Sequence, residues 1–357
     1  MPLKPDDRYR ELFALISRKG DESYEAIRET FESLSPIKRE QALRWVREFS
    51  NYSKANSSLL HLAAEKNAIK VTRLLVEEYR ADINFGRDAT LLKNRTPLHY
   101  AAFKNSSRVA QYLLTCQNPL PLIVHKDIDG RTPLHMAARY GAVGVINALL
   151  DKHPDIVDLH DKHASPPLCL AIHYRQREAF DTLLDRGAAI PEDVLIHAIK
   201  HDPEGGFVRN LIDRGANVTF ARKLDGMTPL HRAANKFHLQ ATRWLLECPG
   251  VHVDVIDRFE STPLHYAVLD IKDESKRDLA FCLIEHGANL QAKSKKGKAP
   301  LDDVSDDNHK KMLIGASYRN FLRFAHAVIE SSYLRHVAIK KMLGVEELRK
   351  LICLFMN

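Results

Sequence analysis

Apolar residues along this chain fall into pairs of short segments, and polar stretches with turn-forming residues separate one pair from the next. The first member of a pair is rich in Leu and Ala. In the second member, apolar residues recur at helical spacing, and these second members lie at 71–75, 109–114, 145–150, 180–184, 207–212, 244–246 and 281–284. The pattern predicts an all-α fold built from a series of two-helix units.

The first helix of several units opens on one six-residue phrase, Thr-Pro-Leu-His-x-Ala, which begins at Thr96, Thr132, Thr228 and Thr262. Pro suits the first helical turn because an N–H there has no partner within the helix. Thr before it is a good N-cap for that turn. The Leu and Ala that follow belong to the buried stripe, so the phrase predicts a helix that begins at the Pro.

The phrase resembles the signature of the ankyrin repeat, which recurs with a period of about 33 residues. The aligned leucines are Leu60, Leu98, Leu134, Leu168, Leu195, Leu230, Leu264 and Leu301. The resemblance covers about residues 55–305. It implies a solenoid of helix–turn–helix repeats with hairpin fingers, about seven in number, followed by a degenerate last repeat that caps the stack.

Two repeats depart from the pattern. Cys169 replaces the His of the phrase, which puts the hydrogen bonds of that His in doubt there. The repeat around Leu195 lacks the Thr-Pro start and follows its predecessor after a short interval. We expect that repeat to have lost its finger, and the stack to bend or twist at this point.

The resemblance gives the recurring His a structural role, in which it ties neighbouring loops together by hydrogen bonds. The residues concerned are His61, His99, His135, His231 and His265. A metal site would need a further ligand at a regular spacing, and the sequence shows none. Turn signals at Asp129-Gly130 and Asp225-Gly226 mark two finger tips. Gly187, Gly215 and Gly287 predict the ends of three outer helices.

Helical segments flank the repeats, which gives three predicted parts: an N-terminal segment (1–52), the repeats (53–305) and a C-terminal segment (306–357). The N-terminal segment has apolar residues on helical faces and is either a cap packed on the first repeat or a separate interaction module. The C-terminal segment combines apolar stripes with many basic residues. It is interpreted as a helical subdomain or cap, with a partner-binding segment and a membrane-surface helix as alternatives.

Composition excludes several classes of protein. The net charge of +7 is mild for 357 residues and does not by itself indicate nucleic-acid binding. The five cysteines show no paired spacing, which favours reduced thiols over disulfides or zinc. The N-terminus has no apolar signal core and no run is long enough to span a membrane. We therefore expect a cytoplasmic protein, or one in a host cytosol if it is exported.

Catalytic motifs are missing from the sequence. It contains no phosphate-binding glycine loop, no dinucleotide fingerprint, no nucleophile elbow, no kinase signature and no zinc-protease helix. Cys169 and His173 stand at helical spacing, which packing within a repeat explains better than catalysis. The prediction is a protein that is not an enzyme and has no cofactor and no metal site.

The resemblance also implies where a partner binds, since contacts in this family come from the finger turns and the two positions after the Ala pair, on a concave surface. By motif position these residues are Leu92, Lys93, Arg95, Phe103, Lys104, Ile128, Asp129, Arg131, Arg139, Tyr140, Lys162, His163, His173, Tyr174, Leu224, Asp225, Met227, Asn235, Lys236, Arg258 and Phe259. Aromatic and Arg side chains are enriched at interface hot spots. The basic ones predict an acidic partner protein or peptide.

Three functions are compatible with these features of the sequence. The first is a protein–protein interaction scaffold or adaptor, with no nucleic-acid partner and no membrane span. A variant of it is a secreted effector, since the chain also resembles in style the ankyrin-repeat effectors of intracellular bacteria. The second is an enzyme or enzyme-recruiting protein that acts through its C-terminal helices. The third is a nucleic-acid or membrane binder that uses Lys293, Lys295, Lys296, Lys298 and the basic tail.

Overall fold

The computed structural model describes residues 7–44, 58–85, 94–116, 120–269 and 274–330. In these ranges the chain forms helices and turns and no β-strand, as the apolar pattern predicted. The chain divides into two compact units, Met1–Pro191 and Glu192–Asn357. The division falls in the short interval before the repeat around Leu195.

The first unit begins with helices that share one core with the first repeat. These elements are α1 (Asp7–Lys19), η1 (Gly20–Ser23), α2 (Tyr24–Glu32), α3 (Pro36–Arg44), α4 (Leu59–Glu65), α5 (Ile69–Arg73) and η2 (Leu74–Glu78). Phe13 and Phe31 are fully buried in the cluster that also holds Leu59 and Leu75 of the repeat. The Asp21 carboxylate accepts hydrogen bonds from the N–H groups of Lys70 (2.7 Å) and Val71 (3.1 Å), at the start of α5. The N-terminal helices are therefore packed on the first repeat.

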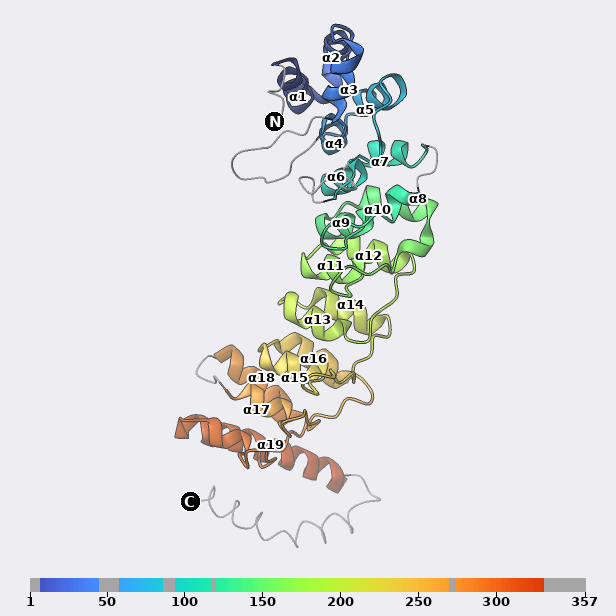
Figure 1. Cartoon of the computed structure of the whole chain (residues 1–357). Coiled ribbons are helices and arrows are strands. Elements are labelled where there is room, and N and C mark those ends of the chain that lie inside the picture. The colour runs from blue at the N-terminus through green and yellow to red at the C-terminus, as the bar shows by residue number, and fades with distance from the viewer. Residues whose placement is uncertain (1–6, 45–57, 86–93, 117–119, 270–273, 331–357) are drawn as a thin grey trace. The chain divides into compact units, whose positions relative to one another are not determined.

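Three further repeats complete the first unit. Their elements are α6 (Pro97–Phe103), α7 (Ser107–Leu113), α8 (Leu120–Ile123), α9 (Pro133–Tyr140), α10 (Val143–Lys152), η4 (Pro154–Ile156), α11 (Pro167–His173) and α12 (Arg177–Asp185). The inner helices α4, α6, α9 and α11 stack in chain order (Figure 1). Close stacking is possible because Ala101 and Ala137 are fully buried at the helix contacts and leave room for the next helix.

The second unit holds the remaining repeats and the long last helix. Its elements are α13 (Val194–His201), α14 (Gly206–Asp213), α15 (Pro229–Asn235), α16 (Leu239–Glu247), α17 (Pro263–Ala267), α18 (Glu274–Glu285), η5 (Pro300–Asp303) and α19 (Asp307–Glu330). The degenerate repeat opens on η5, a single 3-10 turn at Pro300. Helix α19 packs against α18, and Asn320 donates a hydrogen bond to the Ile284 carbonyl (3.0 Å). The apolar stripes predicted beyond residue 330 lie outside the described residues.

The recurring His has the predicted loop-tying role, and this prediction is confirmed. The Thr96 N–H donates to His99 Nδ1 (3.2 Å), so the ring proton lies on Nε2, which donates to the Arg131 carbonyl in the next finger (3.1 Å). The same bond to a following finger recurs at His61 to Arg95, His135 to Ser165, His231 to Ser261 and His265 to Lys298. Burial lowers the pKa of His99 to about 3 and those of His61 and His135 to about 4. These rings are therefore neutral in the folded protein at pH 7.

Neighbouring fingers are also joined by backbone hydrogen bonds. The Lys162 N–H donates to the Asp129 carbonyl (3.2 Å), and the Arg258 N–H donates to the Asp225 carbonyl (3.0 Å). Gly130 adopts a φ of +75°, and a Cβ there would lie 2.7 Å from the Lys162 nitrogen. Glycine is therefore required at position 130 of the predicted turn, both by the left-handed backbone and by the close approach of the next finger.

Gly130→Ala should lower the free energy of unfolding by about 2–3 kcal/mol, because it combines left-handed strain with a clash against the next finger. Gly187→Ala is the matched control: Gly187 has a φ of +86° but open space around its Cβ position. That control should cost only about 1–2 kcal/mol. Urea unfolding monitored by circular dichroism measures both, and equal losses would show that the finger contact adds nothing.

Candidate interaction surface

Two arginines of the predicted basic surface are paired with aspartates of neighbouring fingers. Arg95 Nε lies 3.1 Å from Asp127 Oδ2, and the Asp127 side chain is fully buried. Arg131 Nε lies 3.6 Å from Asp161 Oδ2 in the next finger, and Arg131 Nη1 lies 3.4 Å from Asp129 Oδ2 in its own finger. The charges of Arg95 and Arg131 are therefore compensated within the stack, and their contact with a partner stays a prediction.

A recurring buried aspartate holds each of three finger turns, and the sequence analysis missed it. Asp127 Oδ1 accepts the N–H groups of Asp129 (2.9 Å) and Arg131 (3.0 Å). Asp161 and Asp257 make the same pair of bonds in their own fingers. Each of the three stands five residues before the Thr or Pro that caps an inner helix. That fixed spacing was the available signal, since Asx side chains stabilise turns of this kind.

A row of aromatic and cationic side chains runs across the C-terminal ends of α6, α9 and α11. We call it the aromatic ladder, and its members are Phe103, Lys104, Arg139, Tyr140, His173 and Tyr174. The Phe103 and Tyr140 rings meet edge to face with centroids 4.6 Å apart. Lys104 Nζ lies 4.5 Å from the Phe103 ring centroid. The structure therefore brings together candidate residues from three successive repeats.

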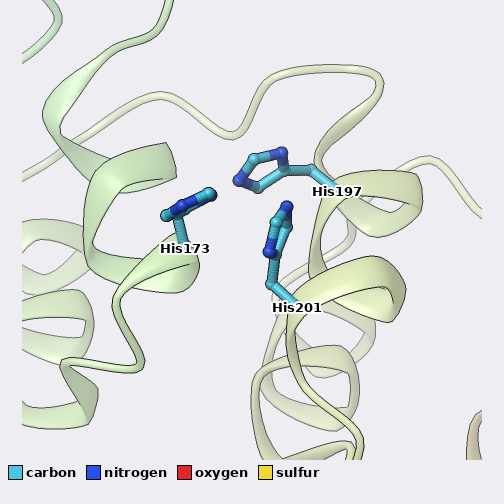
Figure 2. Close-up of side chains that lie close together, drawn as sticks. All are labelled: His173, His197 and His201. Carbon is cyan, nitrogen blue, oxygen red and sulfur yellow. The ribbon is translucent and has the colours of Figure 1, made fainter.

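Arg139 is the centre of the aromatic ladder. Its guanidinium carbon lies 5.2 Å from the Tyr140 ring centroid and 4.4 Å from that of Tyr174. Its buried Nε has no hydrogen-bond partner among the described residues. At the end of α11, the ring centroids of His173 and Tyr174 lie 4.7 Å apart. Figure 2 labels the His173 ring. Stacking against aromatic faces holds the Arg139 head group without neutralising it.

Other predicted contact residues of the first unit lie on the finger turns. Ile128 is 40% exposed, and Lys162 and His163 are exposed. Leu92 and Lys93 lie outside the described residues. Cys169, four residues before His173, is buried within α11, which agrees with a packing role.

In the second unit, most of the predicted contact residues are exposed. Leu224 is 75% exposed and Phe259 is 58% exposed. Lys236 and Arg258 are exposed and Asn235 is half-buried. Arg258 donates a hydrogen bond to the Leu224 carbonyl (3.0 Å). A cavity of about 330 Å³ opens beside Phe259 and is lined in part by Tyr266, Leu269 and Lys296.

The prediction that Met227 lies on the exposed contact surface is wrong, because its side chain is only 5% exposed. It stands directly before the N-cap Thr228, where the chain leaves the finger and enters α15. Its N–H donates to Asp225 (3.1 Å) and its carbonyl accepts from the Arg222 N–H (3.0 Å). These bonds close the turn and direct the side chain inward. Arg222 pairs with Asp225 and lowers the pKa of that carboxyl.

The repeat architecture and the recurring Thr-Pro-Leu-His-x-Ala helix define a class of protein built from stacked helix–turn–helix repeats. The family model described as ankyrin repeats (3 copies) matches residues 37–121, 120–193 and 195–294. This chain belongs to the ankyrin-repeat family.

Curated relatives share the repeats at low identity. Ankyrin repeat protein nuc-2 of Neurospora crassa is 27% identical over 57% of this chain and 22% of its own length. Human Rabankyrin-5 is 27% identical over 72% of this chain and 22% of its own length. The chain thus spans about a fifth of these two relatives. The probable 26S proteasome regulatory subunit p28 of Saccharomyces cerevisiae is 27% identical over 61% of this chain and 97% of its own length.

Among solved structures, the ankyrin repeat domain of Bcl-3 is 20% identical, with a TM-score of 0.42, and the match covers 73% of this chain and all of that domain. Within the described ranges, no helix combines the length and apolar character needed to cross a membrane.

Proposed function

We propose that this protein is a non-catalytic interaction scaffold that holds a partner protein or peptide on the aromatic ladder. The observation that carries the proposal is the half-exposed row of rings around Arg139, which joins three repeats on one face. Tyr and Arg are the side chains most enriched at interface hot spots, where they combine large contact area with polar groups. Repeat proteins bind through extended surfaces of this kind.

The charges of the aromatic ladder favour an acidic partner. Lys104, Arg139 and Lys162 have no salt bridge among the described residues, whereas Arg95 and Arg131 have intramolecular ones. Among these five residues, the uncompensated charges are therefore those of Lys104 and Arg139 on the ladder and of Lys162 on a finger turn. Affinity for the partner should fall as salt rises toward about 0.5 M, since exposed charge pairs are screened.

We also place the protein in the cytoplasm of its own cell, or in a host cytosol if it is exported. This placement rests on cysteine chemistry: none of the four described cysteines forms a disulfide, as is usual for a reducing compartment. The proposed scaffold needs no cofactor, because it acts by binding alone.

Affinity capture with cross-linking mass spectrometry tests the proposal, with the Arg139→Ala/Tyr140→Ala/Tyr174→Ala protein beside wild type. In wild type we expect cross-links to the repeats that contain α6, α9 and α11. In the variant we expect at least about a tenfold loss of the bound partner, as for hot-spot truncation. Arg108→Ala/Arg177→Ala, on the exposed sides of outer helices α7 and α12, is the matched control. Equal partner recovery by all three proteins would refute the ladder as the binding site.

Tyr140→Ala alone should separate binding from stability. Tyr140 is 37% exposed, and the substitution removes its edge-to-face contact with Phe103 and its stacking with Arg139. The free energy of unfolding should therefore drop by only about 0.5–1.5 kcal/mol. Partner affinity should fall by about 2 kcal/mol or more if Tyr140 is a hot spot. Thermal unfolding and a titration with the captured partner measure the two quantities. A larger loss of stability than of affinity would make Tyr140 a structural residue.

A further inference from the structure

Two histidines lie side by side on α13, the inner helix of the fifth repeat. His197 and His201 are four residues apart, so their side chains leave the same face of the helix one turn apart. Their ring centroids are 4.7 Å apart, and ring nitrogens of the two come within 4.8 Å (Figure 2). Both residues are half-buried, so a solvated ion has access to them.

The repeat itself does not require this pair. Ile196 occupies the position of the loop-tying His in the fifth repeat, so neither His197 nor His201 has that task. At the positions of His197 and His201, other repeats carry pairs that share no chemistry: Tyr100 with Lys104, Met136 with Tyr140, and Arg232 with Lys236. The two imidazoles are therefore a property of this repeat and not of the family pattern.

Helix α13 holds the pair on a fixed support. Leu195 and Ala198 are fully buried, and Ile199 is 2% exposed. The helix packs against α14 and α15 of the same unit. With the backbone held in this way, only rotation of the two side chains is needed to direct one nitrogen of each ring at a common point. Metal–nitrogen bonds of about 2.0–2.1 Å place two such nitrogens roughly 3 Å apart.

We propose that His197 and His201 form a two-nitrogen chelate for a late divalent transition-metal ion, such as Ni²⁺ or Zn²⁺, with water in the remaining coordination positions. Neutral imidazole is a preferred ligand of these ions, whereas Mg²⁺ and Ca²⁺ require oxygen ligands. Occupancy of this metal site does not depend on the proposed scaffold function.

Isothermal titration of the full chain with NiCl₂ at pH 7.5 tests the site. Ni²⁺ is the probe because thiols compete more strongly for Zn²⁺. We expect His201→Gln, which removes one nitrogen and keeps a good helix former, to weaken binding by roughly tenfold or more. His252→Gln removes an exposed histidine of the same unit and should bind like wild type. MgCl₂ should give no heat of binding.

Hydrogen exchange tests whether the His201→Gln substitution itself changes the fold. Ni²⁺ should increase protection of α13 amides in wild type and leave those of the His201→Gln protein unchanged, while both proteins show the same protection without metal. Two outcomes would overturn the proposal: Ni²⁺ binding of equal strength in wild type and His201→Gln, or metal-induced protection that maps elsewhere in the chain.

Discussion

The free energy of unfolding of this protein should fall steeply as the pH drops below about 6.5, the ordinary pKa of histidine. In the folded chain, burial holds the pKa of His61 and His135 at about 4 and that of His99 at about 3. Between the ordinary value and these lowered values, the unfolded chain takes up protons that the folded chain does not. Acid therefore favours unfolding, and stability is fully present only above about pH 6.5.

The expected size of this effect is large. Each such histidine contributes a slope of about 1.4 kcal/mol per pH unit in that window. Three together imply a loss of several kcal/mol by about pH 5, which is a large share of the stability of a typical domain. Urea unfolding at several pH values between 7.5 and 5 measures the slope.

Single substitutions assign the pH dependence to the buried rings. His135→Asn should lower stability at pH 7.5, because it breaks the tie to the Ser165 carbonyl. It should also reduce the slope by roughly a quarter to a third, since it removes one of the buried histidines whose pKa is lowered, which are His61, His99, His135 and His231. His163→Gln, which changes an exposed histidine, should leave the slope as in wild type. A stability that stays constant from pH 7.5 to pH 5 would contradict the proposed cause.

Leu134→Ala should lower the free energy of unfolding by about 2–5 kcal/mol, as for other buried leucines. Leu134 is fully buried in α9, and α9 packs between α6 and α11. The cost combines the lost transfer of the side chain from water with the cavity left behind. Chemical denaturation of the full chain gives the value.

Ile128→Ala is the matched control for this substitution, because Ile128 is an apolar residue of the same unit with 40% of its surface exposed. It should change stability by roughly 0.5 kcal/mol or less. Since each repeat contacts only its neighbours, hydrogen exchange in Leu134→Ala should be faster mainly in the repeats containing α6, α9 and α11. A loss below about 0.5 kcal/mol would mean that Leu134 is not part of the core.

Much of the fold could be predicted because its signals are local and repeated. Thr96 before Pro97 sets the start of a helix, and Leu98 and Ala101 place its buried face within six residues of chain. His99 could be assigned a role because it stands at one fixed position of the repeat, for which the family resemblance implies a loop-tying function. In a solenoid, neighbours in sequence are also neighbours in space, so a periodic pattern determines both the helices and their stacking.

The partner surface was predicted less well because it depends on contacts between repeats that differ in sequence. Arg95 and Arg131 are paired with aspartates about one repeat further along the chain, and nothing local distinguishes a paired Arg from a free one. Met227 stands at a finger position that is half-buried or exposed in other repeats, but its own side chain is buried. Candidate residues could be selected by position, whereas their charge state and exposure depend on the folded fingers.

By itself, then, the sequence determined the all-α repeat architecture, the helix starts at Thr-Pro and the loop-tying histidines, and it selected candidate positions for a partner. Only the tertiary structure decided how those positions are used. It packed Phe103 against Tyr140 and Arg139 against Tyr174, paired Arg95 with Asp127, and placed His197 beside His201. The physical reason is the distance along the sequence over which each interaction acts. Caps and apolar stripes act within one helix, while side-chain geometry on the surface depends on packing between elements.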